Sequence, residues 1–249
     1  MNNRIAQVGY SQRIRLEWLE FTANLVLAGN DEASIYSALQ ALLKDKLSVE
    51  GDAPRGNREK AISILMKVWV RPPKELSYLR REGLVLLSNL PRHDHIAVHW
   101  GMLMAVYPFW GAVAAHVGRL LRLQGTVALS QVQQRICEHY GERETVSRAT
   151  RRVLRSFVDW GVLRDTPSKG IYTYGLSKEI KDRRLISWLI EAVLHTQPES
   201  PKELQVILNS TSLFPFHIKP ISAIQLIEHS ENLDAFQSDN NEFLMLKRR

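Results

Sequence analysis

Apolar side chains recur every three to four residues through most of the first 90 positions, a period that places them on one face of a helix. The pattern predicts amphipathic helices at residues 11–29, 31–47, 58–70 and 74–90. Asn30 or Asp31 is expected to cap the second helix, because short polar side chains accept hydrogen bonds from the first free N–H groups. The polar residues 48–59 are predicted to form a loop, and Pro72 and Pro91 are predicted to end the third and fourth helices.

A longer apolar run follows, and residues 96–118 contain no Asp, Glu, Lys or Arg. The run is long enough to span a bilayer, so a membrane span is one interpretation. Pro108 disfavours helical geometry at Tyr107, however, and divides the run into halves of about ten residues, each too short to span. We therefore predict two buried helices that meet at Pro108.

The pattern changes after Gly125. It predicts a short strand, a helix, a longer helix and a hairpin, at residues 125–129, 130–141, 142–161 and 162–175. Ser130 and Gln133 have the spacing of a capping box, and Gly161 is expected to close the longer helix. Preceded by a helix, this order resembles a winged helix-turn-helix domain, and the resemblance covers residues 108–175.

The last 70 residues show a related order. Three helices and a hairpin are predicted at residues 177–196, 200–209, 221–230 and 233–248, with Pro201 in the first turn of the second helix. The third helix has no Lys or Arg, so this unit is expected to contact protein rather than DNA. The predicted fold is mainly α: a helical domain at 1–107, a winged helix-turn-helix at 108–176 and a second, smaller winged-helix-like interaction domain at 177–249.

Positive charge is concentrated in one part of the chain. The net charge is +7, from 33 Lys and Arg against 26 Asp and Glu. Residues 119–184 hold fourteen of the basic and seven of the acidic residues, whereas the rest of the chain has nineteen of each. The whole surplus therefore lies in and beside the predicted winged helix. Such a local surplus favours phosphate binding, because the attraction and the release of counterions grow with the charges on one face.

The predicted helix at 142–161 has one cationic and one apolar face. At about 100° per residue, four arginines share one side and define an arginine stripe: Arg148, Arg151, Arg152 and Arg155. The apolar residues fall nearly opposite: Val146, Ala149, Val153, Phe157 and Trp160. A solvated helix face is the simpler interpretation of such a stripe, since Glu138, Glu142 and Glu144 are near enough in sequence to form weak surface ion pairs with it.

The position of this helix favours DNA instead. In helix-turn-helix proteins the second helix of the pair enters the major groove with its N-terminal half at the base edges. Arginine grips guanine bidentately, while residues further along the helix and at the wing suit phosphates. The residues predicted to contact DNA are Arg143, Thr145, Ser147, Arg148, Arg151, Arg152, Arg155 and Lys169.

Other chemistry has little support in the sequence. Cys137 is the only cysteine, which excludes an internal disulfide. His95 and His99 are spaced to share a helix face, as metal-binding histidines are, but no third ligand is evident. The glycine loops match neither GxxxxGK[ST] nor GxGxxG, and no GxSxG is present. We expect no catalytic residue, metal or cofactor, and a non-enzymatic protein.

The overall plan, an all-helical first half followed by "VALSQVQQRICEHYGERETVSRATRRVLRSFVDWGVLRDTPSKGIYTY", resembles helical DNA-binding accessory proteins of BREX-type phage-resistance systems. The resemblance implies a role in a multi-protein antiviral defence assembly. The expected partners are double-stranded DNA and other proteins of such a complex, with no membrane and a possible homo-oligomer. The first 25 residues lack the apolar core of a secretory signal, so a cytoplasmic location is expected. A dimeric winged-helix transcription regulator and a protein-only scaffold are the alternatives.

Overall fold

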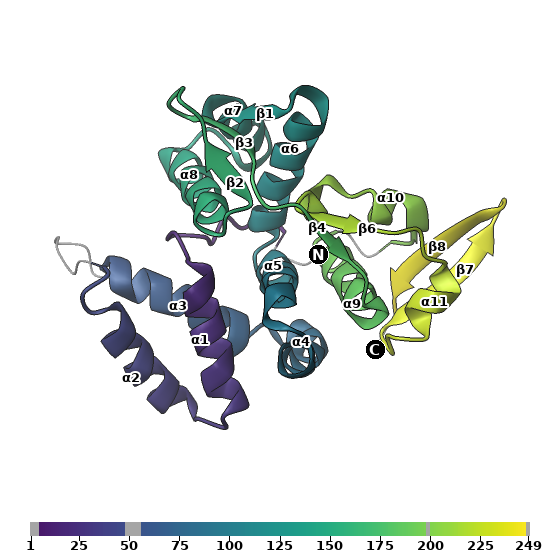
Figure 1. Cartoon of the computed structure of the whole chain (residues 1–249), viewed down its shortest axis with the longest axis horizontal. Helices are drawn as coiled ribbons and strands as arrows, with labels where there is room; N and C mark the ends of the chain where they lie inside the picture. Colours follow the sequence, from purple (N-terminus) through teal and green to yellow (C-terminus); the bar gives the residue numbers. More distant parts are fainter. Residues whose placement is uncertain (1–4, 48–55, 198–199, 248–249) are drawn as a thin grey trace.

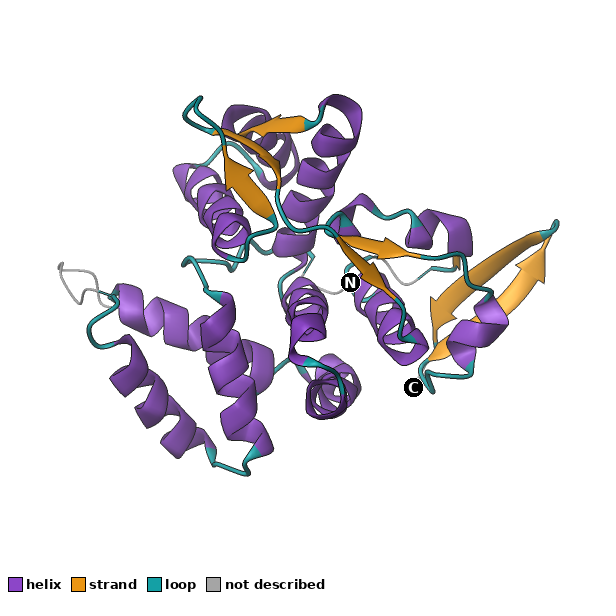
Figure 2. Cartoon of the chain, viewed as in Figure 1, coloured by secondary structure: helices purple, strands orange, loops and turns teal. Residues whose placement is uncertain are grey.

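The computed structural model describes residues 5–47, 56–197 and 200–247, and is mainly helical with three small sheets. The predicted mainly α class is confirmed. Most of the loop predicted at 48–59 lies outside the described residues. Figures 1 and 2 show three groups of elements arranged around the central helix α5.

The first group contains the four predicted N-terminal helices: α1 (Leu16–Leu27), α2 (Glu32–Leu43), α3 (Asn57–Trp69) and α4 (Ser77–Asn89). Asp31 caps α2, and its Oδ1 accepts a hydrogen bond from the Ser34 N–H at 2.7 Å. Short 3-10 turns occur at η1 (Lys74–Leu76), η2 (Arg92–Asp94) and, later in the chain, η3 (Thr211–Leu213). The apolar faces of these helices face α5 and one another, as their period predicts.

The uncharged run forms the two predicted helices, α5 (His95–Val106) and α6 (Pro108–Gln124). Every residue of α5 from Ile96 to Val106 is buried, and the helix packs against α1, α3, α4, α6 and α9. Burial on all sides explains why this helix carries no Asp, Glu, Lys or Arg. Among the described residues no single helix is long and apolar enough to cross a membrane; the pair Arg92–Val106 and Pro108–Gln124 passes that test only together, and it is bent by 118°.

The second group, which we call the middle module (residues 108–176), begins with α6. It continues with β1 (Thr126–Ala128), α7 (Leu129–Tyr140), α8 (Glu144–Asp159), β2 (Leu163–Asp165) and β3 (Ile171–Tyr174). The strands form an antiparallel sheet in the order β1-β3-β2. Gly161 adopts a left-handed φ of 72° and closes α8 as predicted. The predicted strand, two helices and hairpin are all present.

The predicted start of α7 is wrong. Ser130 lies inside the helix, and the chain turns helical at Leu129, directly after β1. The Leu129 N–H donates to the Gly170 carbonyl at 2.8 Å, so pairing with the hairpin fixes where the strand ends and the helix begins. Gln133 therefore does not complete a capping box with Ser130; its Nε2 donates to the Ser147 carbonyl at 2.9 Å and joins α7 to α8.

The third group, the C-terminal module (residues 177–247), differs from the prediction at its start. Residues Lys178–Ile180 form β4, which pairs in parallel with β6 (Phe216–Ile218), and α9 begins only at Arg183 and ends at Leu194. Asp182 caps α9, since its Oδ1 accepts from the Leu185 N–H at 2.8 Å. The alternating burial of β4, with Ile180 buried and Glu179 exposed, suits a strand.

The remaining elements are β5 (Lys202–Glu203), α10 (Leu204–Leu208), α11 (Ala223–Ile227), β7 (Leu233–Ser238) and β8 (Asn241–Leu246). Pro201 precedes the strand β5 and does not begin a helix, which corrects the prediction at that point. The predicted hairpin is confirmed and turns at Asp239 and Asn240, both with positive φ. The sheet order β5-β8-β7 repeats the order β1-β3-β2 of the middle module.

The buried apolar side chains form one connected core that runs through all three groups. Helix α9 of the C-terminal module packs on α5, and Gly101 makes this possible because a Cβ there would lie 2.5 Å from the Trp188 ring. Trp100 stacks on Phe157 of α8 at 4.8 Å between ring centroids. The middle module is therefore fixed to the rest of the chain through the buried face of α8.

Candidate nucleic-acid interface

Helix α8 separates its apolar and cationic faces as the sequence predicts. Its buried residues are Val146, Ala149, Thr150, Val153, Leu154, Ser156 and Phe157. Trp160, just beyond the helix, is also buried. The arginine stripe lies on the opposite side, so the buried face fixes the direction in which the arginines point.

The structure places most of the predicted DNA-contacting residues on accessible positions. Arg143, Thr145, Arg148, Arg151 and Lys169 are exposed, and Arg152 and Arg155 are half-buried. Ser147 differs, because its hydroxyl lies 3.5 Å from the Cys137 Sγ of α7. Its side chain is thus directed at the neighbouring helix rather than along the arginine stripe.

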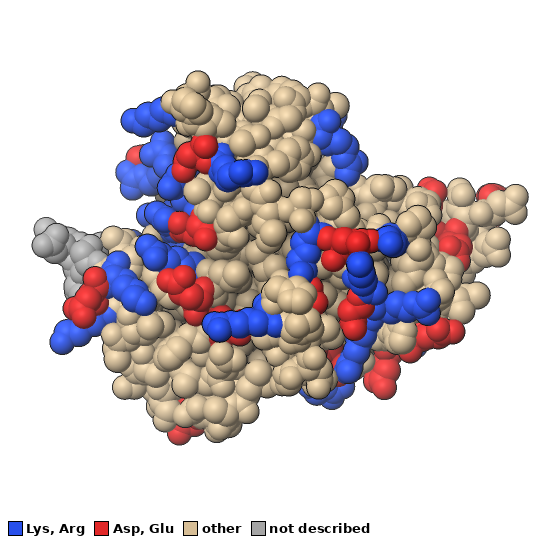
Figure 3. Space-filling model, in the orientation of Figure 1, with Lys and Arg blue, Asp and Glu red and all other residues tan. Residues whose placement is uncertain are grey.

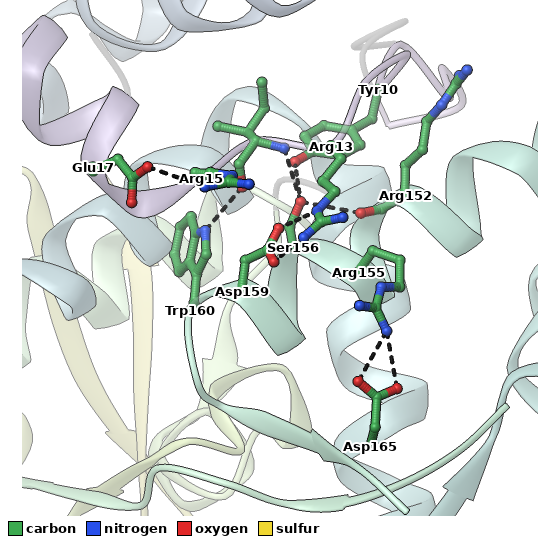
Figure 4. A network of polar contacts seen from close by, with 11 residues as sticks. Tyr10, Arg13, Arg15, Glu17, Arg152, Arg155, Ser156, Asp159, Trp160 and Asp165 are labelled. Carbon is green, nitrogen blue, oxygen red and sulfur yellow. Dashed lines mark hydrogen bonds and ion pairs between the residues drawn. The ribbon is translucent and has the colours of Figure 1, made fainter. Parts of the chain in front are cut away.

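Two arginines of the stripe have carboxylate partners. Arg148 pairs with Glu144 one turn earlier in the helix. The Arg155 Nη1 donates to both carboxylate oxygens of Asp165 in β2, at 2.9 and 3.1 Å, as Figure 4 shows. Partial burial lowers the pKa of Arg155, but the hydrogen bonds and charges of Asp165 and Tyr172 together outweigh it, so the net pKa is raised. Arg155 is therefore held toward the hairpin in the free protein.

The other two arginines of the stripe have no such partner. Arg151 and Arg152 make no side-chain hydrogen bond or ion pair with any residue that the structure describes. Burial lowers the pKa of Arg152, and the nearby charge of Arg148 lowers it further. A phosphate beside Arg152 would stabilise its charged form, because the attraction to the anion would offset both the cost of desolvation and the repulsion by Arg148.

A segment from the N-terminus, which we call the N-terminal strap (residues 5–15), crosses the C-terminal half of α8. Arg13 forms a two-pronged ion pair with Asp159, and the Ile14 N–H donates to the Ser156 hydroxyl at 3.0 Å. The Trp160 Nε1–H donates back to the Ile14 carbonyl at 3.0 Å. Figure 4 shows these contacts beside Arg152 and Arg155. The strap thus adds a basic residue next to the stripe and covers the end of α8.

No sequence pattern indicated this strap, and the prediction of a helix from residue 11 is wrong there, because residues 11–15 are not helical and α1 begins at Leu16. Its residues lie more than 140 positions from their partners in α8, and no local pattern links them. One signal was available for Asp159 itself: at 100° per residue it lies on the same side as the arginine stripe. That acidic residue ends the stripe, and its partner had to come from elsewhere in the chain.

The loop between β2 and β3 carries Lys169. Gly170 follows with a φ of 78°, and the Thr166 hydroxyl donates to the carbonyls of Ser168 and Ile171 at 3.2 and 3.0 Å. Figure 1 shows this loop at the top of the middle module, on the side of α8. In Figure 3 basic side chains follow one another along the left edge of that module, with acidic side chains among them.

The histidine pair considered as a metal site belongs to a different arrangement. Glu20 of α1 binds both rings, with 2.9 Å to His95 Nδ1 and 2.7 Å to His99 Nε2. The Trp69 Nε1–H donates to His99 Nδ1 at 3.1 Å, so the buried His99 ring is neutral and donates to Glu20. Hydrogen bonding by His99 lowers the pKa of Glu20 to about 2. The described residues contain no group of three or more His, Cys, Asp or Glu side chains suited to a metal ion.

Comparison with known proteins gives no information about this site. No model of a protein family, no curated protein and no solved structure matches the chain. The functional argument therefore rests on the arrangement of α7, α8 and the β2–β3 hairpin alone.

Proposed function

We propose that the middle module is a winged helix-turn-helix and that it binds double-stranded DNA, with α8 as the recognition helix and the β2–β3 loop as the wing. In this proposal the chain is a non-enzymatic accessory component of a bacterial multi-protein assembly of the phage-defence type. The observation that carries the DNA proposal is an arginine stripe, exposed at Arg148 and Arg151 and half-buried at Arg152 and Arg155, on a helix whose other face is buried. This helix lies between a packed helix and a hairpin. The defence assembly rests on the sequence resemblance alone.

The contacts follow from the position of each side chain. Thr145, Arg148 and Arg151 lie in the first half of α8 and are assigned to base edges. Arg152, Arg155 and Lys169 are assigned to phosphates, which position the protein without reading sequence. Arg143, just before the helix, is also assigned to the backbone. Ser147 is already engaged with Cys137, so we assign it to the packing of α7 on α8.

Two carboxylates shape this surface before DNA arrives. Glu144 and Asp165 form ion pairs with Arg148 and Arg155, which restricts these side chains and lowers the entropy that they lose on binding. The same carboxylates reduce the positive charge that a phosphate meets. The proposed interface is thus preorganised, and its affinity is expected to depend strongly on the concentration of salt.

Duplex binding measured by fluorescence anisotropy at several salt concentrations tests the proposal. The double variant R148A/R151A removes two proposed base contacts, each worth about 1–3 kcal/mol, so duplex affinity should fall by at least about tenfold at every salt concentration. The matched control R71A/R81A removes two arginines of similar exposure, whose side chains are 61% and 65% exposed, far from α8 in sequence. Equal binding by the wild type and both double variants would refute the assignment of α8.

A protein-only scaffold is the second candidate. It is favoured by the ion pairs of Arg148 and Arg155, which neutralise half of the stripe within the chain itself. Surface ion pairs of this kind are common on helices that bind nothing. Absence of duplex binding by the wild type even at low salt would select this candidate.

A further inference from the structure

The C-terminal hairpin has a free edge. Strand β8 lies between β5 and β7, so β7 is an outer strand of the three-stranded sheet, six residues long. Figure 1 shows the hairpin projecting from the body of the protein with β7 on its outer side. An edge of this length offers unpaired backbone groups to another strand.

Hydrogen bonds identify which backbone groups point to that edge. The Lys247 N–H donates to the Asn232 carbonyl at 2.7 Å, so residue 232 faces β8. The Ala235 N–H donates instead to its neighbour's carboxylate, Asp234 Oδ1, at 3.0 Å. Because backbone groups alternate along an antiparallel strand, the even-numbered residues of β7 bond to β8 and the odd-numbered ones face outward. The Asp234 carboxylate thus accepts a hydrogen bond from one of these outward N–H groups. No strand among the described residues pairs with the outer edge of β7.

The solvent-facing side of the hairpin is apolar next to this edge. Phe236 and Phe243 lie opposite each other and stack at 5.4 Å between centroids, with an angle of 8° between the rings. Phe236 is 44% exposed, whereas Leu233 and Leu244, on the other face, are buried in the core. A stacked aromatic pair thus lies at the border of an unpaired strand, with its outer ring accessible.

We propose that this edge pairs with β7 of a second copy of the chain, in an antiparallel arrangement with the two-fold axis at Phe236. Opposite residues of an antiparallel pair share one face, so the sum of their numbers must be even for β7 to pair with itself. With the axis at Phe236, Ala235 faces Gln237 of the second copy, and both present outward backbone groups. On pairing, the Ala235 N–H exchanges its hydrogen bond to Asp234 Oδ1 for one to the Gln237 carbonyl of the second copy. Phe236 then faces its own copy in a non-hydrogen-bonded pair, where side chains approach most closely.

The side chains of β7 fit this register. The two copies of Phe236 extend the existing stack into a row of four phenyl rings with the two copies of Phe243. Asp234 faces Ser238 of the second copy, and Asp239 faces Leu233, so no carboxylate lies opposite another. A parallel arrangement in register would place each of these carboxylates beside its own copy. A self-complementary patch of this kind fits a closed two-fold dimer, which is why a second copy is the proposed occupant.

The strength of the dimer is limited by its size. A six-residue edge and four rings make a small interface, so we expect a dissociation constant of roughly 1–100 µM. This inference does not depend on DNA binding, since no residue of the arginine stripe takes part in it.

Disulfide cross-linking tests the register. In a C137S background, which removes the single native cysteine, one chain carries D234C and another carries S238C. The proposed pairing places these two positions opposite each other, within the Cα separation that a disulfide spans. Under mild oxidation the mixture of the two chains should cross-link, and each chain alone should not. Cross-linking of either chain alone as fast as the mixture would overturn the register.

Sedimentation velocity over a range of concentrations tests the dimer itself. The wild type should shift from monomer to dimer, and F236K should stay monomeric. V206K is the matched control, because Val206 is a 61% exposed apolar residue of the same module, outside the hairpin; it should dimerise as the wild type does. Equal melting curves for the two variants show that both are folded. A wild type that stays monomeric up to several hundred micromolar, or equal dimerisation by both variants, would overturn the proposal.

Discussion

Glu20 offers a direct test of how the N-terminal helices are held to α5. Its carboxylate, with a side chain 15% exposed, receives hydrogen bonds from His95 and His99, and His99 is itself fixed by Trp69. E20Q keeps the shape of the side chain but replaces one acceptor oxygen by an N–H₂ group. One histidine N–H then faces another donor in a mostly buried position, which is costly because the two donors lose their acceptor and have little access to water.

The pKa of Glu20 gives the magnitude. It is lowered from 4.5 to about 2, first by the hydrogen bond from His99 and then by that from His95, against the opposing effect of burial. At about 1.4 kcal/mol per pKa unit, the ionised carboxylate contributes about 3 kcal/mol to the free energy of unfolding. Because the folded pKa is the lower one, this contribution is complete above pH 4.5 and is lost as the pH falls from 4.5 toward 2.

Urea denaturation followed by tryptophan fluorescence measures this contribution. At pH 7, E20Q should lower the free energy of unfolding by about 2–3 kcal/mol, and the difference from wild type should shrink to about half at pH 3. The control E17Q alters a carboxylate of the same helix that is 61% exposed and 3.5 Å from Arg15, so it should cost less than about 1 kcal/mol. A difference between E20Q and wild type that stays constant from pH 7 to pH 3 would refute the hydrogen-bonded carboxylate as its source.

Three further substitutions have defined outcomes. G118A should lower the melting temperature by several degrees, because the added Cβ would lie 2.2 Å from a carbonyl oxygen of η3; an unchanged value would contradict that packing. D165N removes the carboxylate that holds Arg155, so duplex binding should become tighter and its salt slope steeper by up to about 1; weaker binding would mean that positioning matters more than charge. D159N should speed hydrogen exchange in the N-terminal strap while the exchange of α5 stays the same, and uniform acceleration would show global destabilisation instead.

Periodicity predicted the elements whose structure is set by their own burial pattern. Helices α1 to α8 follow the spacing of apolar residues, and α5 could be recognised as buried because it lacks charge over its whole length. The hairpins could be predicted from their turn residues, as Asp239 and Asn240 show with their positive φ. In α8 the same period that buries Phe157 also fixes the direction of the arginines, so the candidate interface was accessible to sequence reasoning.

The errors arose where a distant partner decides the local structure. Residues 178–180 form a strand because β6, almost 40 residues later, supplies the hydrogen bonds. The start of α7 depends on the Gly170 carbonyl, and the histidine pair depends on Glu20, some 75 positions earlier. The N-terminal strap likewise depends on distant partners, since its contacts with α8 join residues more than 140 positions apart in the sequence. Local propensity and spacing carry no information about such partners.

The two modules use one order of elements for surfaces of opposite charge. Helix α8 is sixteen residues long and carries the arginine stripe, whereas the corresponding α11 has five residues and no Lys or Arg. The described residues 200–247 hold three lysines against six Asp and Glu, so phosphate is repelled where the middle module attracts it. The proposed dimer edge and the proposed DNA surface are therefore separable. F236K should leave the DNA affinity of a single chain unchanged and remove only the gain that a dimer obtains from two linked sites. R148A/R151A should weaken DNA binding without changing the dimer.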